Sequence, residues 1–285
     1  MKATKKTLTW PIFIISLPDC TDRRAPLVSD LREAGLEFEI FPAVDARQGV
    51  PAEFEQMIDR DGATLALHRK MSDAEFGCAL SHQLIYQKVV GMGLPGAVIL
   101  EDDARLTPEA ARAISTGFFE KYNFTQFNYG FARIPRFAVT SKEETEEIST
   151  IRLLCNSGLA SGYAVSRKAC EFISRHSIPL KLPADWPCDL RRLNPRITVP
   201  RLVSAPQEVL TQSTLMADRD RSRKEGCLAS ELEPEGNLIK KKKNPQSVFL
   251  KNFGWIYAKT LTRKKRKSVL SRLLNHNTSR VRNKK

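Results

Sequence analysis

The chain has no closely spaced cysteine pair and no long apolar run, and these absences narrow its class. Its six cysteines are scattered without a C-x-x-C pair, which favours reduced thiols in a cytosolic protein over a disulfide framework. Cys78 and His82 lie four residues apart, but no second pair in the sequence completes a zinc site. No stretch reaches the roughly 20 apolar residues of a membrane span. The run after the N-terminal lysines is short and contains Pro11, so we expect a buried strand rather than a signal peptide.

Acidic residues are missing from one end of the chain. Residues 240–285 contain 16 lysines and arginines and no aspartate or glutamate, which leaves 30 basic and 32 acidic residues in the rest. The formal net charge of +14 therefore belongs to the tail. Within it, four side chains would share one helical face: Phe249, Phe253, Ile256 and Tyr257. Basic flanks around such a face favour an anionic membrane surface as the partner, over a disordered tail or a nucleic-acid-binding tail.

Residues 1–215 have the patterning of one α/β domain. The opening is β-α-β, with a strand, a helix and a strand expected at Ile12–Leu17, Thr21–Ala34 and Phe38–Val44. This opening is typical of a mostly parallel central sheet. The polar residues 216–247 are expected to link this domain to a basic amphipathic tail at 248–285.

The remaining elements follow from capping and periodicity. Residues 45–71 show no regular pattern, whereas Ser72 to Glu75 is a capping box that opens a helix reaching about Val90. Further expected elements are a strand at 97–100, a helix at 110–119, strands near 151–154 and 157–165, a helix at 167–175 capped by Ser166, an ordered loop at 182–190 and a strand at 197–203.

Three consecutive carboxylates, Glu101-Asp102-Asp103, directly follow the apolar strand Ala97–Leu100. Thr107 and Pro108 are typical of a helix N-cap and first turn. The acids are therefore expected at the C-terminal end of a strand, where open α/β sheets bind ligands. Packed carboxylates repel one another, and a divalent cation with oxygen ligands, Mg²⁺ or Mn²⁺, would relieve that repulsion. The alternative is a solvated acidic turn.

Six segments along the chain carry a resemblance to a known family. They are Ile15-Ser16-Leu17 with Asp22-Arg23-Arg24, Phe41-Pro42-Ala43-Val44-Asp45, Ala74-Glu75-Phe76-Gly77-Cys78-Ala79-Leu80-Ser81-His82, Val98-Ile99-Leu100-Glu101-Asp102-Asp103, Ser161-Gly162-Tyr163-Ala164-Val165-Ser166, and Pro183-Ala184-Asp185-Trp186. In order and spacing they resemble glycosyltransferase family 25, the lipopolysaccharide and lipooligosaccharide glycosyltransferases, across most of residues 10–215. Ala46 departs from the glycine expected after Ala-Val-Asp.

The resemblance implies a GT-A-like nucleotide-sugar-binding domain with a nucleotide-sugar donor, such as UDP-galactose, and a saccharide or glycolipid acceptor. It also implies work at the cytoplasmic face of an inner membrane, with the protein bound peripherally. The alternative from another class is a catalytically inactive α/β protein that binds anionic membrane or nucleic acid through its tail.

Sugar transfer from a nucleotide-sugar donor needs a metal site and contacts to the donor, and each candidate residue is expected to serve one of these roles. Strand alternation puts Glu101 and Asp103 on one side, so Asp103 is expected to be the direct metal ligand. Glu101 is expected to contact the metal or the donor, and Asp102 the donor or a water near the metal. Arg23 and Arg24 are candidates for the diphosphate, with a solvated helix start as the alternative. Ser161-Gly162 would let backbone approach the sugar, unless it is a tight packing position.

An inverting transferase also needs a base for the acceptor hydroxyl. Asp185 is the first candidate and Asp189 the second, and a loop-capping aspartate is the alternative for both. His82 and Trp186 are candidates for the edge of the site. Their alternatives are a structural histidine and a core tryptophan.

Overall fold

The computed structural model describes residues 8–130, 132–135, 142–145, 148–204 and 256–257. Its centre is an eight-stranded sheet in the order β2-β1-β3-β9-β5-β10-β8-β7. The strands are β1 Ile12–Ser16, β2 Glu39–Pro42, β3 Gly96–Glu101, β5 Phe124–Gln126, β7 Lys142–Glu143, β8 Ser149–Arg152, β9 Gly162–Ser166 and β10 Arg196–Val199. Two short ribbons lie outside it: β4 Arg105–Leu106 with β11 Val203–Ser204, and β6 Arg133–Ile134 with β12 Ile256–Tyr257.

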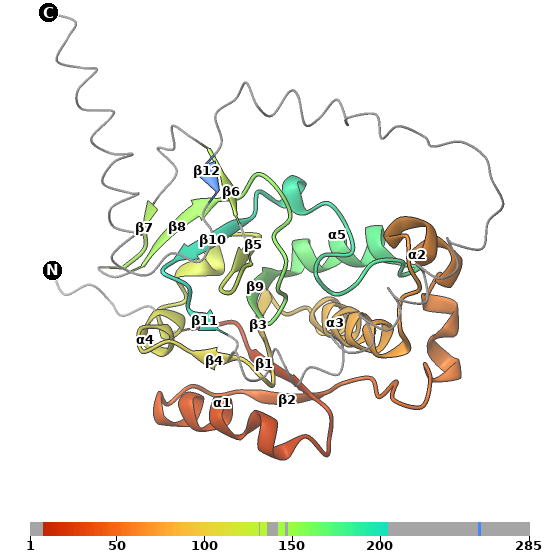
Figure 1. The fold of residues 1–285 in the computed structure, drawn as a ribbon. Coiled ribbons are helices and arrows are strands. Elements are labelled where there is room, and N and C mark those ends of the chain that lie inside the picture. Colours follow the sequence, from red (N-terminus) through yellow and green to blue (C-terminus); the bar gives the residue numbers. More distant parts are fainter. Residues whose placement is uncertain (1–7, 131, 136–141, 146–147, 205–255, 258–285) are drawn as a thin grey trace, which may run out of the picture.

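Helices cover both faces of this sheet (Figure 1). The α-helices are α1 Thr21–Glu33, α2 Arg60–Leu67, α3 Asp73–Gly91, α4 Ala110–Ser115 and α5 Arg167–Ser177. The 3-10 helices are η1 Ala52–Met57, η2 Phe118–Lys121 and η3 Leu190–Leu193. The predicted α/β class is confirmed, and the arrangement is consistent with a GT-A-like domain. None of the described helices combines the length and apolar character needed to cross a membrane.

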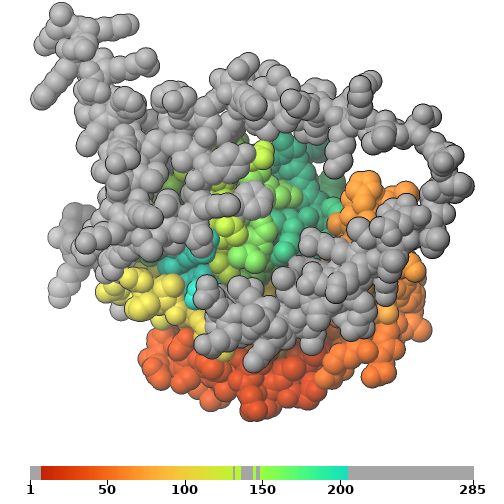
Figure 2. Space-filling view, in the orientation of Figure 1, coloured from red at the N-terminus to blue at the C-terminus, as the bar shows by residue number. Residues whose placement is uncertain are grey.

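The sheet is parallel where the chain begins and mixed beyond that. Strand β1 pairs in parallel with both β2 and β3. Strand β9 runs antiparallel to both of its neighbours, β3 and β5. In Figure 2 the red and orange N-terminal segments lie in the lower and right-hand part of the coloured surface, and the green of the later strands lies above them.

Alternation along β1 explains the two cores. Ile12 and Ile14 pack in the cluster that includes Leu27 and Leu31 of α1, whereas Phe13 and Ile15 pack in the cluster with α3 and α5. All four side chains are at most 7% exposed. A strand that reads as continuously apolar is buried on both faces in this way, which is why the run could be read correctly as a first strand.

The region 45–71 is more regular than its sequence pattern suggested. It contains η1 and α2, and the prediction of an irregular segment was wrong there. Asp59 caps α2 by accepting a hydrogen bond from the Gly62 N–H at 2.7 Å. This N-cap was visible in the sequence, but a helix of eight residues is too short to show a clear apolar period.

The boundary after the acids also differs from the expectation. Thr107 and Pro108 do not begin a helix, since Glu109 is the N-cap residue of α4. Instead, Arg105–Leu106 pairs with β11, and the Thr107 N–H donates to the Leu202 carbonyl at 2.9 Å. Because its backbone pairs with this distant segment, Thr107 follows the β-ribbon and does not cap a helix.

Strands β9 and β10 are among the strands that are shorter than predicted, and each has an identifiable reason. Strand β9 begins only at Gly162, because the Gln126 side-chain amide donates to the carbonyls of Ser157, Gly158 and Leu159 and holds them in a turn. The expected strand 197–203 is divided into β10 and β11 at Pro200, which has no N–H to offer a ladder.

The tail and linker lie outside the described residues except at one point. Ile256–Tyr257 forms β12, antiparallel to β6, with Ile256 opposite Ile134 and Tyr257 opposite Arg133. The expectation that these two residues lie on a helical face is therefore wrong. β-branched and aromatic residues suit a strand at least as well as a helix.

Candidate active site

The three acids lie where the sequence placed them, at the C-terminal end of β3. Glu101 is the last residue of the strand, and its N–H donates to the Ser161 carbonyl at 3.0 Å. The Asp102 N–H donates to the Ile15 carbonyl at 3.1 Å. The acids are therefore fixed between the end of β1 and the start of β9.

Asp102 is the most deeply buried of the three acids, with 1% of its surface exposed. It accepts hydrogen bonds from Ser16 Oγ at 2.9 Å and from Arg23 Nε at 2.6 Å, and it forms an ion pair with Arg23. Charge-assisted hydrogen bonds of this kind are strong. Asp102 thereby ties the start of α1 to the ends of β1 and β3.

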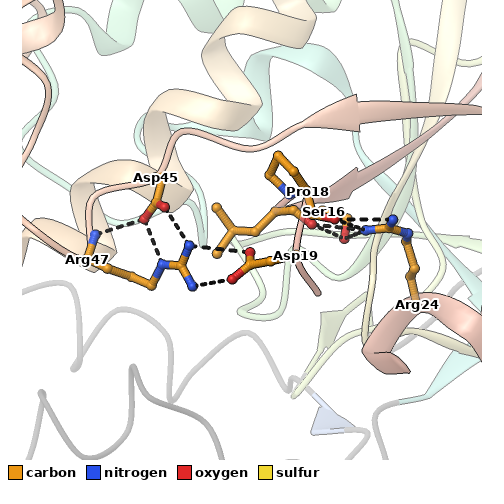
Figure 3. A network of polar contacts seen from close by, with 7 residues as sticks. Ser16, Pro18, Asp19, Arg24, Asp45 and Arg47 are labelled. Atoms are coloured by element: carbon orange, nitrogen blue, oxygen red, sulfur yellow. Dashed lines mark hydrogen bonds and ion pairs between the residues drawn. The ribbon is translucent and has the colours of Figure 1, made fainter. Parts of the chain in front are cut away.

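The two arginines of α1 face this strand end in different ways. Arg24 Nη1 donates to Ser16 Oγ at 3.1 Å, to the Leu17 carbonyl at 2.9 Å and to the Pro18 carbonyl at 3.3 Å (Figure 3). Arg23 lines the neighbouring cavity and keeps 48% of its side chain exposed. The structure thus leaves Arg23 better placed than Arg24 to reach a diphosphate.

Asp103 is half-buried, and its Oδ1 atom has no hydrogen-bond partner among the described residues. Burial and the nearby charge of Glu101 raise the pKa of Asp103 to about 6. An orphaned carboxylate oxygen is costly unless something compensates it. The oxygens of Asp103 and Glu101 suit a hard divalent cation, so the residues present fit Mg²⁺ or Mn²⁺.

The raised pKa of Asp103 predicts a pH-dependent stability in metal-free protein. The folded form prefers the protonated acid, so stability should fall as pH rises from about 4 to about 6. Above that range, the free energy of unfolding of Asp103→Asn should exceed that of the parent by up to about 3 kcal/mol. The variant should therefore unfold at a higher temperature. The test is thermal unfolding in EDTA at pH 4.5 and pH 7.5, where the advantage of the variant should be much larger at the higher pH.

Asp189→Asn is the matched control for this stability test. The Arg191 guanidinium lowers the pKa of Asp189, so its ionised form is favoured and its removal should not stabilise the protein at pH 7.5. An Asp103→Asn variant that is less stable than the parent at pH 7.5 in EDTA would contradict the prediction.

The α3 segment supports the site from beneath. Its capping box is present as predicted, with Ser72 and Glu75 bonding each other's backbone, and Arg69 also pairs with Glu75 at 2.7 Å. A Cβ on Gly77 would come within 2.8 Å of the Ala46 Cβ and 3.0 Å of the Val44 carbonyl. The absent side chain at Gly77 therefore lets the loop after β2 lie directly on the helix.

Ser81 fastens the same loop, because its Oγ accepts from the Val44 N–H at 2.9 Å and donates to the Gly77 carbonyl at 2.7 Å. Ser81 was not among the site residues predicted from the sequence. The signal that could have found it was its position one turn after Gly77 within the strongest family-like segment.

His82 is 2% exposed and contacts Glu101 directly. Its Nε2 lies 3.3 Å from Glu101 Oε1, and its Nδ1 lies 2.7 Å from the Tyr163 hydroxyl. Cys78 completes a group of three ligand-type side chains with His82 and Glu101, whose ligand atoms all lie within 4.8 Å of one another. His82 therefore lies at the edge of the site and is also a satisfied buried histidine.

A cavity of about 780 Å³ opens beside the acids. Its walls are formed by the C-terminal ends of β1 and β3, the loop after β2 and the start of α3. Its charged lining residues are Arg23, Arg47, Arg60 and Lys70, with Asp45, Asp73, Glu101, Asp102 and Asp103. Cations next to a carboxylate cluster are the groups expected around a metal-bound diphosphate.

Arg47 organises the outer wall of this cavity. It contacts Asp19 Oδ2 and Asp45 Oδ2 at 2.6 Å each, which connects the loops after β1 and β2 (Figure 3). Its guanidinium lowers the pKa of Asp45 to about 2. Because these three side chains are half-exposed, a ligand phosphate can compete with the aspartates for Arg47.

The two candidate bases lie outside the lining of this cavity. Asp185 Oδ1 accepts from the N–H groups of Leu159 and Ala160 at 3.1 Å and 3.0 Å. These residues directly precede Ser161, whose carbonyl accepts from Glu101. Asp185 is thus tied to the segment that adjoins the acids, and it is exposed to solvent.

Asp189 is engaged elsewhere in the 182–190 loop, which is ordered as expected. It caps η3 through the Arg191 N–H and forms an ion pair with the Arg191 side chain at 2.5 Å. That guanidinium lowers the pKa of Asp189, which makes its carboxylate a weaker base. The geometry favours Asp185 over Asp189.

Trp186 and Ser161-Gly162 are placed chiefly by packing. The Trp186 ring is 3% exposed, lies edge-on to Phe124 and Tyr163, and donates its Nε1–H to the Ser157 carbonyl. No broad face of the ring is open to a sugar. A Cβ on Gly162 would come within 2.8 Å of Val203, and Ser161 Oγ accepts from Asn128 Nδ2 at 2.8 Å.

Comparison with known proteins agrees with this architecture. A family model described as glycosyltransferase family 25 (LPS biosynthesis protein) matches residues 9–187. The chain belongs to glycosyltransferase family 25. It is 26% identical over 170 residues to the lipooligosaccharide biosynthesis protein lic2B of Haemophilus influenzae, covering 58% of this chain and 62% of that protein.

Two further relatives have more specific names. The lacto-N-neotetraose biosynthesis glycosyltransferase LgtE of Neisseria meningitidis serogroup B is 26% identical over 180 residues, covering 61% of this chain and 62% of that protein. Procollagen galactosyltransferase 1 of Danio rerio is 26% identical over 192 residues, covering 65% of this chain and 32% of that protein. The chain spans less than two thirds of the length of these relatives.

Proposed function

We propose that this protein is a metal-assisted glycosyltransferase that moves a sugar from a nucleotide-sugar donor to a saccharide or glycolipid acceptor. The observation that carries the proposal is Asp103, whose buried Oδ1 has no hydrogen-bond partner among the described residues and which lines the cavity beside Glu101 at a strand end. Membership of the family and the names of the relatives support glycosyl transfer in lipooligosaccharide synthesis as the reaction class.

The donor is proposed to be UDP-galactose. A cavity of about 780 Å³ is large enough for a nucleotide sugar. Arg23, Arg47 and Lys70 line it and supply positive charge for the diphosphate, while Asp103 and Glu101 would hold Mg²⁺ or Mn²⁺. When bound, the cation supplies Lewis-acid stabilisation of the leaving diphosphate. The choice of galactose is supported by the name of the Danio rerio relative.

The acceptor is proposed to approach from the side of the 157–161 segment. There Asp185 takes the proton of the acceptor hydroxyl as its oxygen attacks the anomeric carbon of the donor, and the nucleoside diphosphate leaves from the opposite face. Attack opposite the leaving group inverts the anomeric configuration. Asp185 is exposed to solvent and accepts from the Leu159 and Ala160 N–H groups, so an acceptor hydroxyl can reach its carboxylate.

Donor binding is tested by screening UDP-sugars and GDP-sugars for thermal stabilisation, with and without Mn²⁺. A ligand at 100 times its dissociation constant should stabilise the fold by about 2.7 kcal/mol. We expect UDP-galactose to raise the unfolding temperature only when the metal is present. Equal stabilisation in EDTA would contradict the metal-assisted site, and no stabilisation by any donor would contradict the enzyme function.

The basic tail is proposed to hold the protein on the cytoplasmic face of an anionic inner membrane, with no part in the chemistry. All of the excess positive charge lies in residues 240–285, and each basic residue near an anionic surface contributes about 1 kcal/mol before salt screening. We expect truncation after residue 239 to release the protein from anionic vesicles in low-salt co-sedimentation. Activity on a short soluble acceptor should remain, and efficiency on a membrane-embedded acceptor should fall.

Truncation also removes Ile256–Tyr257, which pairs with β6. A second variant therefore keeps the whole chain and replaces Arg263, Lys264, Lys265, Arg266 and Lys267 with glutamine. Equal vesicle binding by this variant and the parent at low salt would contradict the tail prediction. So would loss of activity on the soluble acceptor in a protein that still folds.

A further inference from the structure

Three different metal-ligating side chains meet at the first of the three acids, Glu101. Cys78 and His82 lie one turn apart on α3, which places them on the same face of the helix. Glu101 comes from the end of β3, 19 residues further along the chain than His82. Their ligand atoms lie within 4.8 Å of one another, and His82 Nε2 is 3.3 Å from Glu101 Oε1. The sequence showed only the first two, because the third depends on the packing of α3 against the sheet.

The chemistry of this group differs from that of Asp103 with Glu101. A thiolate, an imidazole and a carboxylate suit Zn²⁺, whereas an all-oxygen set suits Mg²⁺ or Mn²⁺. The thiolate and carboxylate together balance the charge of a divalent ion. Tetrahedral zinc with bonds of about 2.0–2.3 Å places ligand atoms roughly 3.3–3.8 Å apart, so side-chain adjustments of about 1 Å would close the group around an ion.

The imidazole of His82 is already oriented by a buried outer partner. Its Nδ1 lies 2.7 Å from the Tyr163 hydroxyl, which lies 2.6 Å from the Tyr86 hydroxyl. Burial raises the pKa of both phenols, so they remain protonated. With a metal on Nε2, the Nδ1–H donates to the Tyr163 oxygen, and Tyr163 donates to Tyr86. Histidines that bind metals are oriented by outer partners in this way.

We propose that Cys78, His82 and Glu101 form a Zn²⁺ site with Tyr163 as the outer partner of the histidine. On binding, the Cys78 thiol releases its proton to solvent and Sγ becomes a ligand, while His82 binds through Nε2. Three protein ligands leave a fourth position for water. Because Glu101 belongs to both sites, occupancy by Zn²⁺ removes a ligand from the Mg²⁺ or Mn²⁺ site. Inhibition of transfer by Zn²⁺ follows, and that part alone rests on the proposed function.

The test uses Co²⁺ as a spectroscopic probe in full-length protein stripped with EDTA. The parent should develop a thiolate-to-cobalt charge-transfer band that Zn²⁺ abolishes. Cys78→Ser should lose the band, and Glu101→Gln should weaken Co²⁺ binding. Cys20→Ser is the matched control because Cys20 is also half-buried and lines the same cavity, and it should keep the band. Circular dichroism checks that each variant is folded.

Tyr163→Phe tests the outer partner. Loss of such a partner typically lowers metal affinity by about 10–100-fold, whereas Tyr122→Phe, which removes a hydroxyl bonded to Glu144 instead, should leave Co²⁺ affinity unchanged. The proposal is overturned if the parent gives no charge-transfer band, or if the band survives in Cys78→Ser. Unchanged affinity in folded Tyr163→Phe refutes the role of Tyr163. None of these readouts requires transferase activity, so the zinc site and the proposed function can fail separately.

Discussion

Asp103→Asn should reduce metal-dependent transfer to background while the protein stays folded. The variant keeps the size of the side chain and removes one anionic ligand from the site. Metal stabilisation of a leaving diphosphate contributes several kcal/mol to the transition state, which corresponds to more than about 10³-fold in rate. The measurements are turnover and donor binding at a series of Mn²⁺ concentrations, and both should lose their metal dependence together.

Asp45→Asn is the matched control for Asp103→Asn. Asp45 also lines the cavity, but Arg47 already neutralises it, so its loss should have a smaller effect on metal dependence. A folded Asp103→Asn protein with near-normal turnover in metal-depleted buffer would remove Asp103 from the metal site. Thermal unfolding at pH 7.5 in EDTA distinguishes a misfolded variant from an inactive one.

Asp185→Asn should lower turnover by about 10²–10⁴-fold, the usual loss for a general base, with little change in donor affinity. The base acts on the acceptor hydroxyl and does not contact the nucleotide. Asparagine keeps an oxygen that can accept from the Leu159 and Ala160 N–H groups, so the 157–161 segment should hold its shape. The measurements are turnover under donor saturation and donor affinity by calorimetry.

Asp189→Asn provides the comparison within the same loop. Its carboxylate is paired with Arg191, and we expect a much smaller change in turnover. If Asp189→Asn shows the large loss and Asp185→Asn does not, the two roles are reversed. If neither variant loses turnover, the base does not lie on this loop.

Local patterns in the sequence predicted the elements that local interactions determine. The continuous apolar run of β1, the capping box of Ser72 and Glu75, and the Ser166 N-cap of α5 were all confirmed. The placement of the acids followed from the apolar strand before them. In each case the signal and the structure that it determines lie within a few residues of one another.

The rest depended on contacts between distant segments. The turn before β9 is held by a hydrogen bond from the side chain of Gln126, which lies on another strand. The Thr107 N–H donates to the carbonyl of Leu202, which is also distant in the sequence. The contact between His82 and Glu101 arises only when α3 packs beneath β3. Burial of Trp186 against Tyr163 likewise follows from tertiary packing. The spacing of residues within a single segment does not predict contacts between residues of distant segments.

The reversed direction of β9 has a consequence for how this protein can diverge from its relatives. Because β9 runs against β3, the segment that enters β9 lies beside the acids that leave β3. The proposed donor and acceptor groups therefore come from separate stretches of chain that meet at one edge of the sheet. On the proposed roles, substitutions around Asp185 and 157–161 would change the acceptor while Glu101 and Asp103 remain as they are, so acceptor range would evolve while donor chemistry is retained.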